Sequence, residues 1–84
     1  MILESVDRVV CEDEMSFEDF LKVVSAVLRR GGVDQTIVVD EHSGRAIENC
    51  KLYLALRKIG VRLVPVSYGV VERVFVSLED MKFF

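Results

Sequence analysis

The sequence has little of several residue types, and each shortage excludes a class of protein. It holds one proline, no tryptophan, one histidine and two cysteines in 84 residues. No apolar run approaches the roughly 20 residues that a membrane-spanning helix needs. Basic residues are in the minority, 11 Lys and Arg against 14 Asp and Glu, which argues against a general polyanion binder. The first residues lack the basic and apolar stretches of an export signal, so we expect a cytoplasmic protein.

The two cysteines, Cys11 and Cys50, are too few for a disulfide framework and have no further Cys or His at zinc-ligand spacing. We expect two buried free thiols, with a Cys11–Cys50 bridge as the alternative. A single Asn, a single Gln and 30% charged residues are typical of proteins from hot environments, in which intracellular disulfides occur. We expect no metal site and no cofactor.

Apolar residues are abundant and make up 51% of the chain, which excludes a disordered protein. A chain of this length folds alone only by burying roughly 60% of its unfolded surface, so it has no room for a second core. No repeat, linker or low-complexity tract divides it. We therefore expect a single domain over residues 1–84, with an apolar surplus available for an interface.

Hydrophobic periodicity and turn residues divide the chain into elements in the order β-α-β-α-β-β. The expected strands are residues 6–11, 36–40, 61–68 and 70–78, and the expected helices are residues 17–30 and about 43–59. Ser16 and Gly31 are the expected caps of the first helix. Ser43 and Gly44 are expected to open the second helix, and Gly60 to end it. With right-handed crossovers, this order predicts a two-layer α/β sandwich, with both helices on one face of a four-stranded mixed sheet.

The second expected helix carries two apolar arcs rather than one. One arc can cover the sheet, but a small domain rarely hides the other. The residues of the second arc are Leu52, Ala55, Leu56 and Ile59. Because this arc needs a partner, the sequence predicts a dimer with its interface on the second helix.

The most informative segment lies at the expected junction of the second strand and the second helix. Backbone N–H groups at a helix start are unpaired and partly positive, and an Arg beside them adds a charged fork that suits phosphate. Gly44, Arg45 and Ala46 are placed to bind a phosphate in this way, and Ser43 and Asn49 can add hydrogen bonds. The alternative is that Gly44 only permits a tight turn and Arg45 is a solvated surface residue.

The motif Gly44-Arg45-Ala46-Ile47 after the second strand, with the order of elements from about residue 6 to residue 78, resembles the Alba family of small archaeal chromatin proteins. The Gly32-Val33 pair that follows the first helix is a second point of agreement. The resemblance implies an Alba-like domain that binds double-stranded DNA, and often RNA. It also implies a dimer built on the second helix and the last strands.

The charge pattern departs from that family. Alba-like proteins carry a lysine pair in the loop before the first helix, where this sequence has Glu14 and Met15. Residues 12–19 contain five acids and no base, and such charge repels a phosphate backbone. The last two strands also leave no room for a long basic arm.

Two hypotheses about function follow from these observations. The first is an Alba-like dimer that binds DNA or RNA through a phosphate contact at the N-terminus of the second helix. The alternative is an interaction protein that has lost duplex DNA binding and forms a heterodimer with a more basic Alba-like chain. In either case the acidic loop sets this sequence apart from a duplex binder.

An enzyme is not expected. The only histidine, His42, is flanked by Asp40, Glu41 and Ser43, so a local metal or Ser-His site can be imagined. A tetrahedral metal site needs at least three convergent ligands, and nothing downstream joins Asp40 and His42. We therefore expect His42 to be a solvated loop residue.

Overall fold

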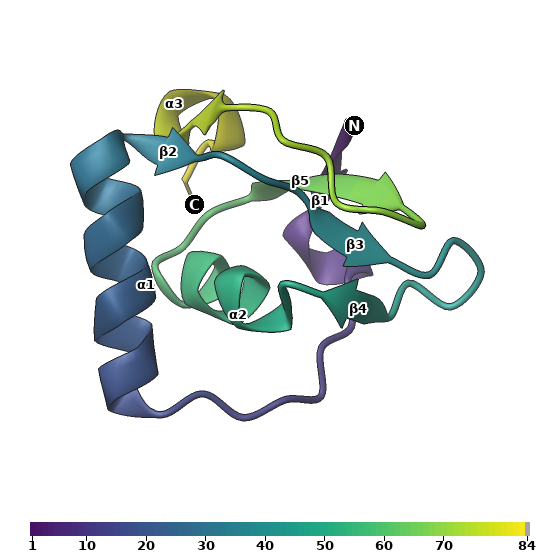
Figure 1. Ribbon diagram of the computed structural model, residues 1–84, viewed down its shortest axis with the longest axis horizontal. Coiled ribbons are helices and arrows are strands. Elements are labelled where there is room, and N and C mark those ends of the chain that lie inside the picture. The colour runs from purple at the N-terminus through teal and green to yellow at the C-terminus, as the bar shows by residue number, and fades with distance from the viewer. Residues whose placement is uncertain (84) are drawn as a thin grey trace.

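The computed structural model describes residues 1–83, which form a four-stranded mixed sheet and two main helices (Figure 1). In chain order the elements are strand β1 (Ile2–Ser5), the 3₁₀ helix η1 (Val6–Arg8), α1 (Phe17–Arg30), β2 (Gly32–Val33), β3 (Ile37–Val39), β4 (Ala46–Glu48), α2 (Cys50–Lys58), β5 (Leu63–Tyr68), β6 (Val76–Ser77) and α3 (Leu78–Met81). None of the helices in this part of the chain is long and apolar enough to cross a membrane.

The main sheet has the strand order β1-β5-β3-β4. Strand β5 pairs antiparallel with β1 and parallel with β3, and β4 pairs antiparallel with β3. A separate antiparallel pair joins β2 to β6. The coarse expectation of a small α/β fold with a mixed four-stranded sheet is confirmed.

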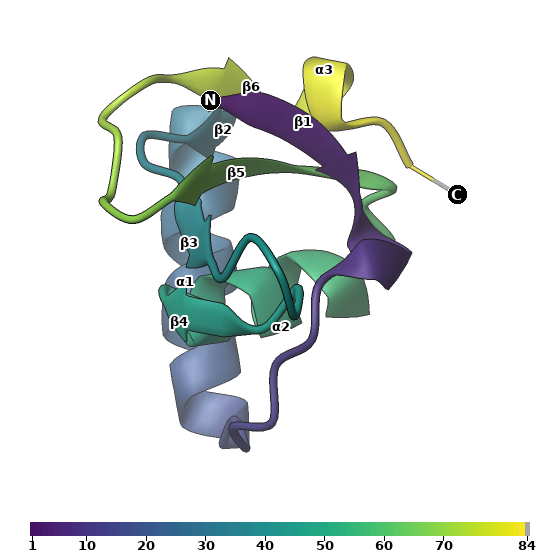
Figure 2. The ribbon, with the colours of Figure 1, turned by 90° about the vertical axis from the view of Figure 1, so that its right-hand side faces the viewer.

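Helix α1 begins and ends where the sequence predicts. The Ser16 hydroxyl accepts a hydrogen bond from the Asp19 N–H at 3.1 Å, which caps the helix start. Gly31 ends the helix in the left-handed conformation, with φ 75°, and its N–H donates to the Leu28 carbonyl. Helix α2 lies between α1 and the strands, as Figures 1 and 2 both show.

Residues 6–11 are not the predicted strand, because their carbonyl groups are held by a tyrosine from α2. The buried Tyr53 hydroxyl lies 2.7 Å from the Val6 carbonyl oxygen and 2.9 Å from that of Val9, and Arg57 donates to the tyrosine oxygen. This arrangement bends the backbone into η1. The strand that pairs with the sheet is instead β1, at the very start of the chain.

The second helix begins later than predicted. Residues 46–48 continue as strand β4, with Ala46 opposite Val39 and Glu48 opposite Val38. Asn49 then adopts φ 64° and turns the chain into α2, which starts at Cys50 and ends before Gly60 as expected. The expected helix start at Ser43 and Gly44 is therefore wrong, because residues 46–48 find a strand partner in β3.

Residues 70–78 are mostly not a strand. Both edges of β5 are already occupied by β1 and β3, so no hairpin partner can pair there. Within this range only Val76 and Ser77 form a strand, β6, and it pairs with β2 instead. The chain then forms the short helix α3, capped by Ser77, which the sequence reasoning missed. The predicted order β-α-β-α-β-β is wrong in these details.

Cys11 and Cys50 form a disulfide, so the expectation of two free thiols is wrong and the alternative holds. Their Cα atoms lie 5.8 Å apart although they are 39 positions apart in sequence. The bond fastens the acidic loop, residues 11–16, to the first residue of α2.

Breaking this bond tests how much it stabilises the fold. Closing a loop of this length stabilises a protein by about 2–4 kcal/mol in the unfolded-state entropy account. We expect Cys11→Ser to lower the free energy of unfolding by about that amount in urea titrations without reductant. Dithiothreitol should lower the free energy of unfolding of the original protein by the same amount and leave that of Cys11→Ser unchanged. If dithiothreitol left the original protein's free energy of unfolding unchanged, the stabilising role of the disulfide would be contradicted.

Candidate functional site

Of the predicted phosphate-binding residues, 43–45 lie in a turn between β3 and β4 and Ala46 is the first residue of β4, so none of these four lies at a helix start. Asp40 organises this turn, since its Oδ1 accepts from the N–H groups of His42 at 2.8 Å and Ser43 at 3.2 Å. These two backbone donors hold the pKa of Asp40 below its ordinary value. The His42 and Ser43 N–H groups are thus already used by a carboxylate within the chain.

Gly44 has a structural reason to be glycine. Its φ is +74°, and a Cβ there would lie 2.8 Å from the Arg8 carbonyl oxygen. The Val10 N–H donates to the Gly44 carbonyl, and Ala46 donates back to Val10. Gly44 therefore permits the turn at positive φ, as the alternative interpretation expects, and also the close approach of the segment after η1, which the sequence does not indicate.

Arg45 is exposed, but its guanidinium group already forms an ion pair with a carboxylate of the same chain. One guanidinium nitrogen lies 3.0 Å from Glu12 Oε1, and another donates to Glu12 Oε2 at 3.3 Å. Both side chains are more than half exposed, so the pair is screened by water. The acidic loop thus supplies the anion that Arg45 would otherwise offer to phosphate.

Asn49 stands apart from the other predicted residues and directs the start of α2. Its side-chain amide donates to the Thr36 carbonyl at 2.8 Å and to Gln35 Oε1 at 3.2 Å. Because the side chain is used there, no side chain caps α2. The N–H groups of the first turn have no partner within the helix and are left for an acceptor from outside it.

The first turn of α2 opens on a cavity of about 380 Å³ between the two main helices. Three cations line it, Lys22 and Arg30 from α1 and Lys51 from α2. Asp34 is the carboxylate in the lining, so positive charge prevails there. Asn49, from the predicted phosphate-contact residues, also lines the cavity, as does Leu52 from the predicted dimer interface.

Two of these cations have carboxylate partners at the rim. Lys51 Nζ lies 3.1 Å from Asp19 Oδ2, and Arg30 lies 3.0 Å from Asp34 Oδ2. Lys22 makes no ion pair with any other residue that the structure describes. Sequence reasoning missed Lys22 and Arg30, because their approach to α2 depends on how the helices pack.

The predicted dimer interface on α2 is not a free surface. Ala55 and Leu56 are fully buried, and Leu52 and Ile59 are half-buried against the core. Helix α1 and the neighbouring elements cover this arc within one chain (Figure 1). Ala55 and Leu56 are therefore not available to a second copy, whereas Leu52 and Ile59 keep part of their surface exposed, and the predicted dimer itself stays a prediction.

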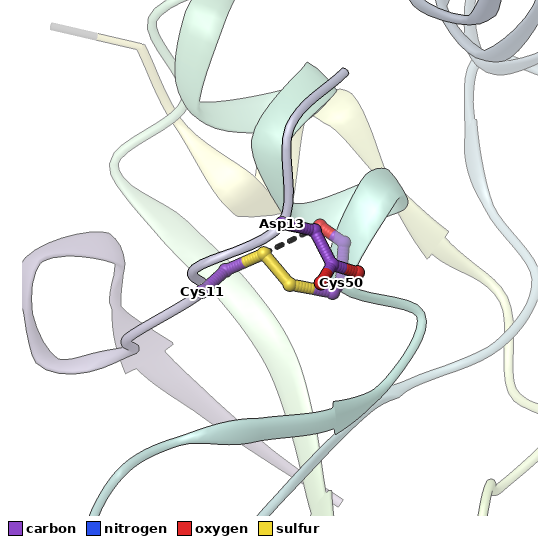
Figure 3. A group of neighbouring side chains, drawn as sticks. All are labelled: Cys11, Asp13 and Cys50. Carbon is purple, nitrogen blue, oxygen red and sulfur yellow. Dashed lines mark hydrogen bonds between the residues drawn. A yellow bond between two sulfur atoms is a disulfide. The ribbon is translucent and has the colours of Figure 1, made fainter.

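A further cluster forms where the acidic loop meets α2. The Asp13 carboxylate and the sulfurs of Cys11 and Cys50 lie within 4.8 Å of one another (Figure 3). The Cys11 sulfur also lies 3.5 Å from the Cys50 carbonyl oxygen. Since the two sulfurs are bonded to each other, the cluster acts here as a covalent link and not as a set of metal ligands.

The ion pair at the cavity rim gives a pH-dependent test. A hydrogen bond from Lys51, and then its charge, lower the pKa of Asp19. A lowered folded-state pKa adds stability above the unfolded value, and that stability is lost as the pH falls through the folded one, here below about pH 4. We expect Lys51→Met to raise the pKa of Asp19 toward its ordinary value in a carboxyl NMR titration.

Lys58→Met is the matched control for this titration, since Lys58 lies over the Phe20 ring and makes no contact with Asp19. We expect it to leave the pKa of Asp19 unchanged. An equal pKa of Asp19 in the original protein and in Lys51→Met would contradict the role given to Lys51.

Comparisons with known proteins support the fold but give no family. No protein-family model and no curated protein matches the sequence. Among solved structures, SbnI with a C-terminal truncation from Staphylococcus aureus superposes with a TM-score of 0.72 at 21% sequence identity. The match covers 82% of this chain and 30% of the SbnI chain. At this identity the chain is similar to SbnI in fold, over less than a third of that protein's length.

Proposed function

We propose that the protein binds nucleic acid by holding a backbone phosphate at the N-terminus of α2. The observation that carries this function is the uncapped first turn of α2, which opens on a cavity lined by three cations. The proposal keeps the nucleic-acid binding that the Alba resemblance implies. It moves the phosphate contact from Gly44 and Arg45 to Lys51 and its neighbours.

The chemistry of the cavity suits a phosphate group. Helix N-terminal N–H groups donate to anions along the helix dipole. Lys51 and Lys22 add mobile charged donors, and Arg30 adds a planar fork that can bind two phosphate oxygens. A phosphate would compete with Asp19 and Asp34 for two of these cations, so the contact is weak and sensitive to salt.

The surroundings favour a single strand over a duplex. The cavity has a volume of about 380 Å³, and the acidic loop at residues 11–16 lies next to α2. A rigid duplex brings a second row of phosphates toward that loop, whereas a single strand can turn away from it. For such a contact, the logarithm of the binding constant should fall with the logarithm of the salt concentration with a slope of about −0.7 per phosphate neutralised on a single strand.

Titration of the protein with inorganic phosphate and then with single-stranded RNA tests this function. We expect the amide NMR signals of residues 50–52 to shift in both titrations. Lys22→Gln and Lys51→Gln should each weaken RNA binding about fivefold in fluorescence anisotropy at low salt, because an exposed charge contact is worth up to about 1 kcal/mol.

Two matched variants separate this cavity from the turn at residues 43–46. Arg45→Gln removes a cation that Glu12 already neutralises, and Arg73→Gln removes an exposed cation outside the cavity. Both should bind RNA as the original protein does. Loss of binding in Arg45→Gln with full binding in Lys22→Gln would place the contact at the turn and contradict the cavity.

The second candidate function is that of an interaction protein for a basic partner, such as a more basic Alba-like chain in a heterodimer. The Glu12–Arg45 pair favours it, because it neutralises the expected phosphate ligand while Asp13 and Glu14 stay exposed. Opposite charge raises association rates and selects partners. The disulfide holds these acids in one place, which lowers the ordering cost of binding.

A lysine-rich peptide serves as the probe for this second function. We expect it to bind the original protein at low salt and to bind at least tenfold more weakly when Glu12, Asp13 and Glu14 are all changed to glutamine. Equal binding by both proteins in isothermal titration would exclude the acidic loop as the partner surface.

A further inference from the structure

The outer side of α1 exposes an apolar stripe that no other part of the described chain covers. Phe17 is 71% exposed, Leu21 46% and Leu28 59%. Val24 lies between them and is half-buried. Figure 1 shows α1 along one edge of the molecule, with α2 on its inner side only. We call these four residues the α1 stripe.

The spacing of the α1 stripe is that of a helix-packing seam. Its residues are separated by four, three and four positions, which places them in one row along the helix. The inner side of α1 is formed by other residues, with Val27 buried and Phe20 and Val23 half-buried. Helix α1 is therefore apolar on two sides, and the single chain uses one of them.

The charges beside the stripe identify its occupant. Glu18 flanks the stripe in the first turn of α1, and Arg29 flanks it on the same side in the last turn. When two copies of α1 run antiparallel, with Phe17 opposite Leu28 and Leu21 opposite Val24, Glu18 of one copy lies about 3 Å along the axis from Arg29 of the other. In a parallel two-fold pair the two Glu18 side chains would lie on opposite sides of the helix pair, and Glu18 would not meet Arg29.

We propose that the α1 stripe packs antiparallel against the α1 stripe of a second copy of this chain, as an isologous two-fold dimer. The same residues serve both copies, since the stripe is apolar along its length and its flanking charges change sign from one end to the other. This dimer uses α1 in place of the α2 surface that the sequence predicts. It stands independently of nucleic-acid binding.

Analytical ultracentrifugation of the full chain tests this dimer. We expect the original protein to be dimeric at micromolar to millimolar concentrations, and Leu21→Glu and Leu28→Glu to raise the dimer dissociation constant at least tenfold. Val70→Glu is the matched control, because Val70 is 69% exposed outside α1, and it should remain dimeric. Far-UV circular dichroism and thermal unfolding check that each variant folds.

Charge reversal tests the antiparallel arrangement and the identity of the partner. Glu18→Arg alone or Arg29→Glu alone sets like charges together and should weaken the dimer, whereas the double variant should recover it. Mixing the two single variants should yield a heterodimer. An original protein that stays monomeric at millimolar concentration, or a double variant as weak as the single variants, would overturn the proposed dimer.

Discussion

The hydrogen bond from the Asn49 side chain to the Thr36 carbonyl, 2.8 Å long, decides where the candidate site lies. It fixes a left-handed residue between β4 and α2, so the strand ends and the helix begins within one residue. It also uses the side-chain amide that faces the helix start, so the first N–H groups of α2 stay uncapped. A helix that began at Gly44 would have presented its N-terminus to the acidic loop instead of to the cavity beside α1.

Ion pairing limits what this cavity can do. The cations that lie within ion-pair distance of a carboxylate include Arg8, Arg30, Arg45, Lys51 and Arg57. A phosphate bound as proposed would have to displace a carboxylate from most of these cations, so the free energy gained would be small. The disulfide strengthens this effect, because it holds Asp13 beside the first residue of α2 (Figure 3). In the proposed function, the helix N-terminus would supply the affinity for an anion, and the acidic loop would reduce it.

The sequence predicted the elements that local chemistry decides. Ser16 and Gly31 cap α1 through hydrogen bonds within a few residues, and both caps were correct. The elements that depend on distant partners were not predictable in this way. Residues 70–78 look like a strand, but β1 and β3 occupy both edges of β5. The candidate site divides in the same way between near and distant neighbours. Asn49 and Lys51 lie at the start of α2, whereas Lys22 and Arg30 reach the cavity only because α1 packs against α2.

The apolar surplus of the sequence is genuine, but its location depends on the tertiary fold. Helix α2 is apolar on two sides because it lies between the sheet and α1, so both sides are wholly or partly buried within one chain. Covering α2 makes α1 the outermost helix, and α1 then carries the surface that remains apolar. Lys22 and Arg30 lie on this same helix, beside the cavity. Under the two proposals, a partner along the α1 stripe would hold in place the helix that carries two of the three cavity cations, so assembly and anion binding would both involve α1.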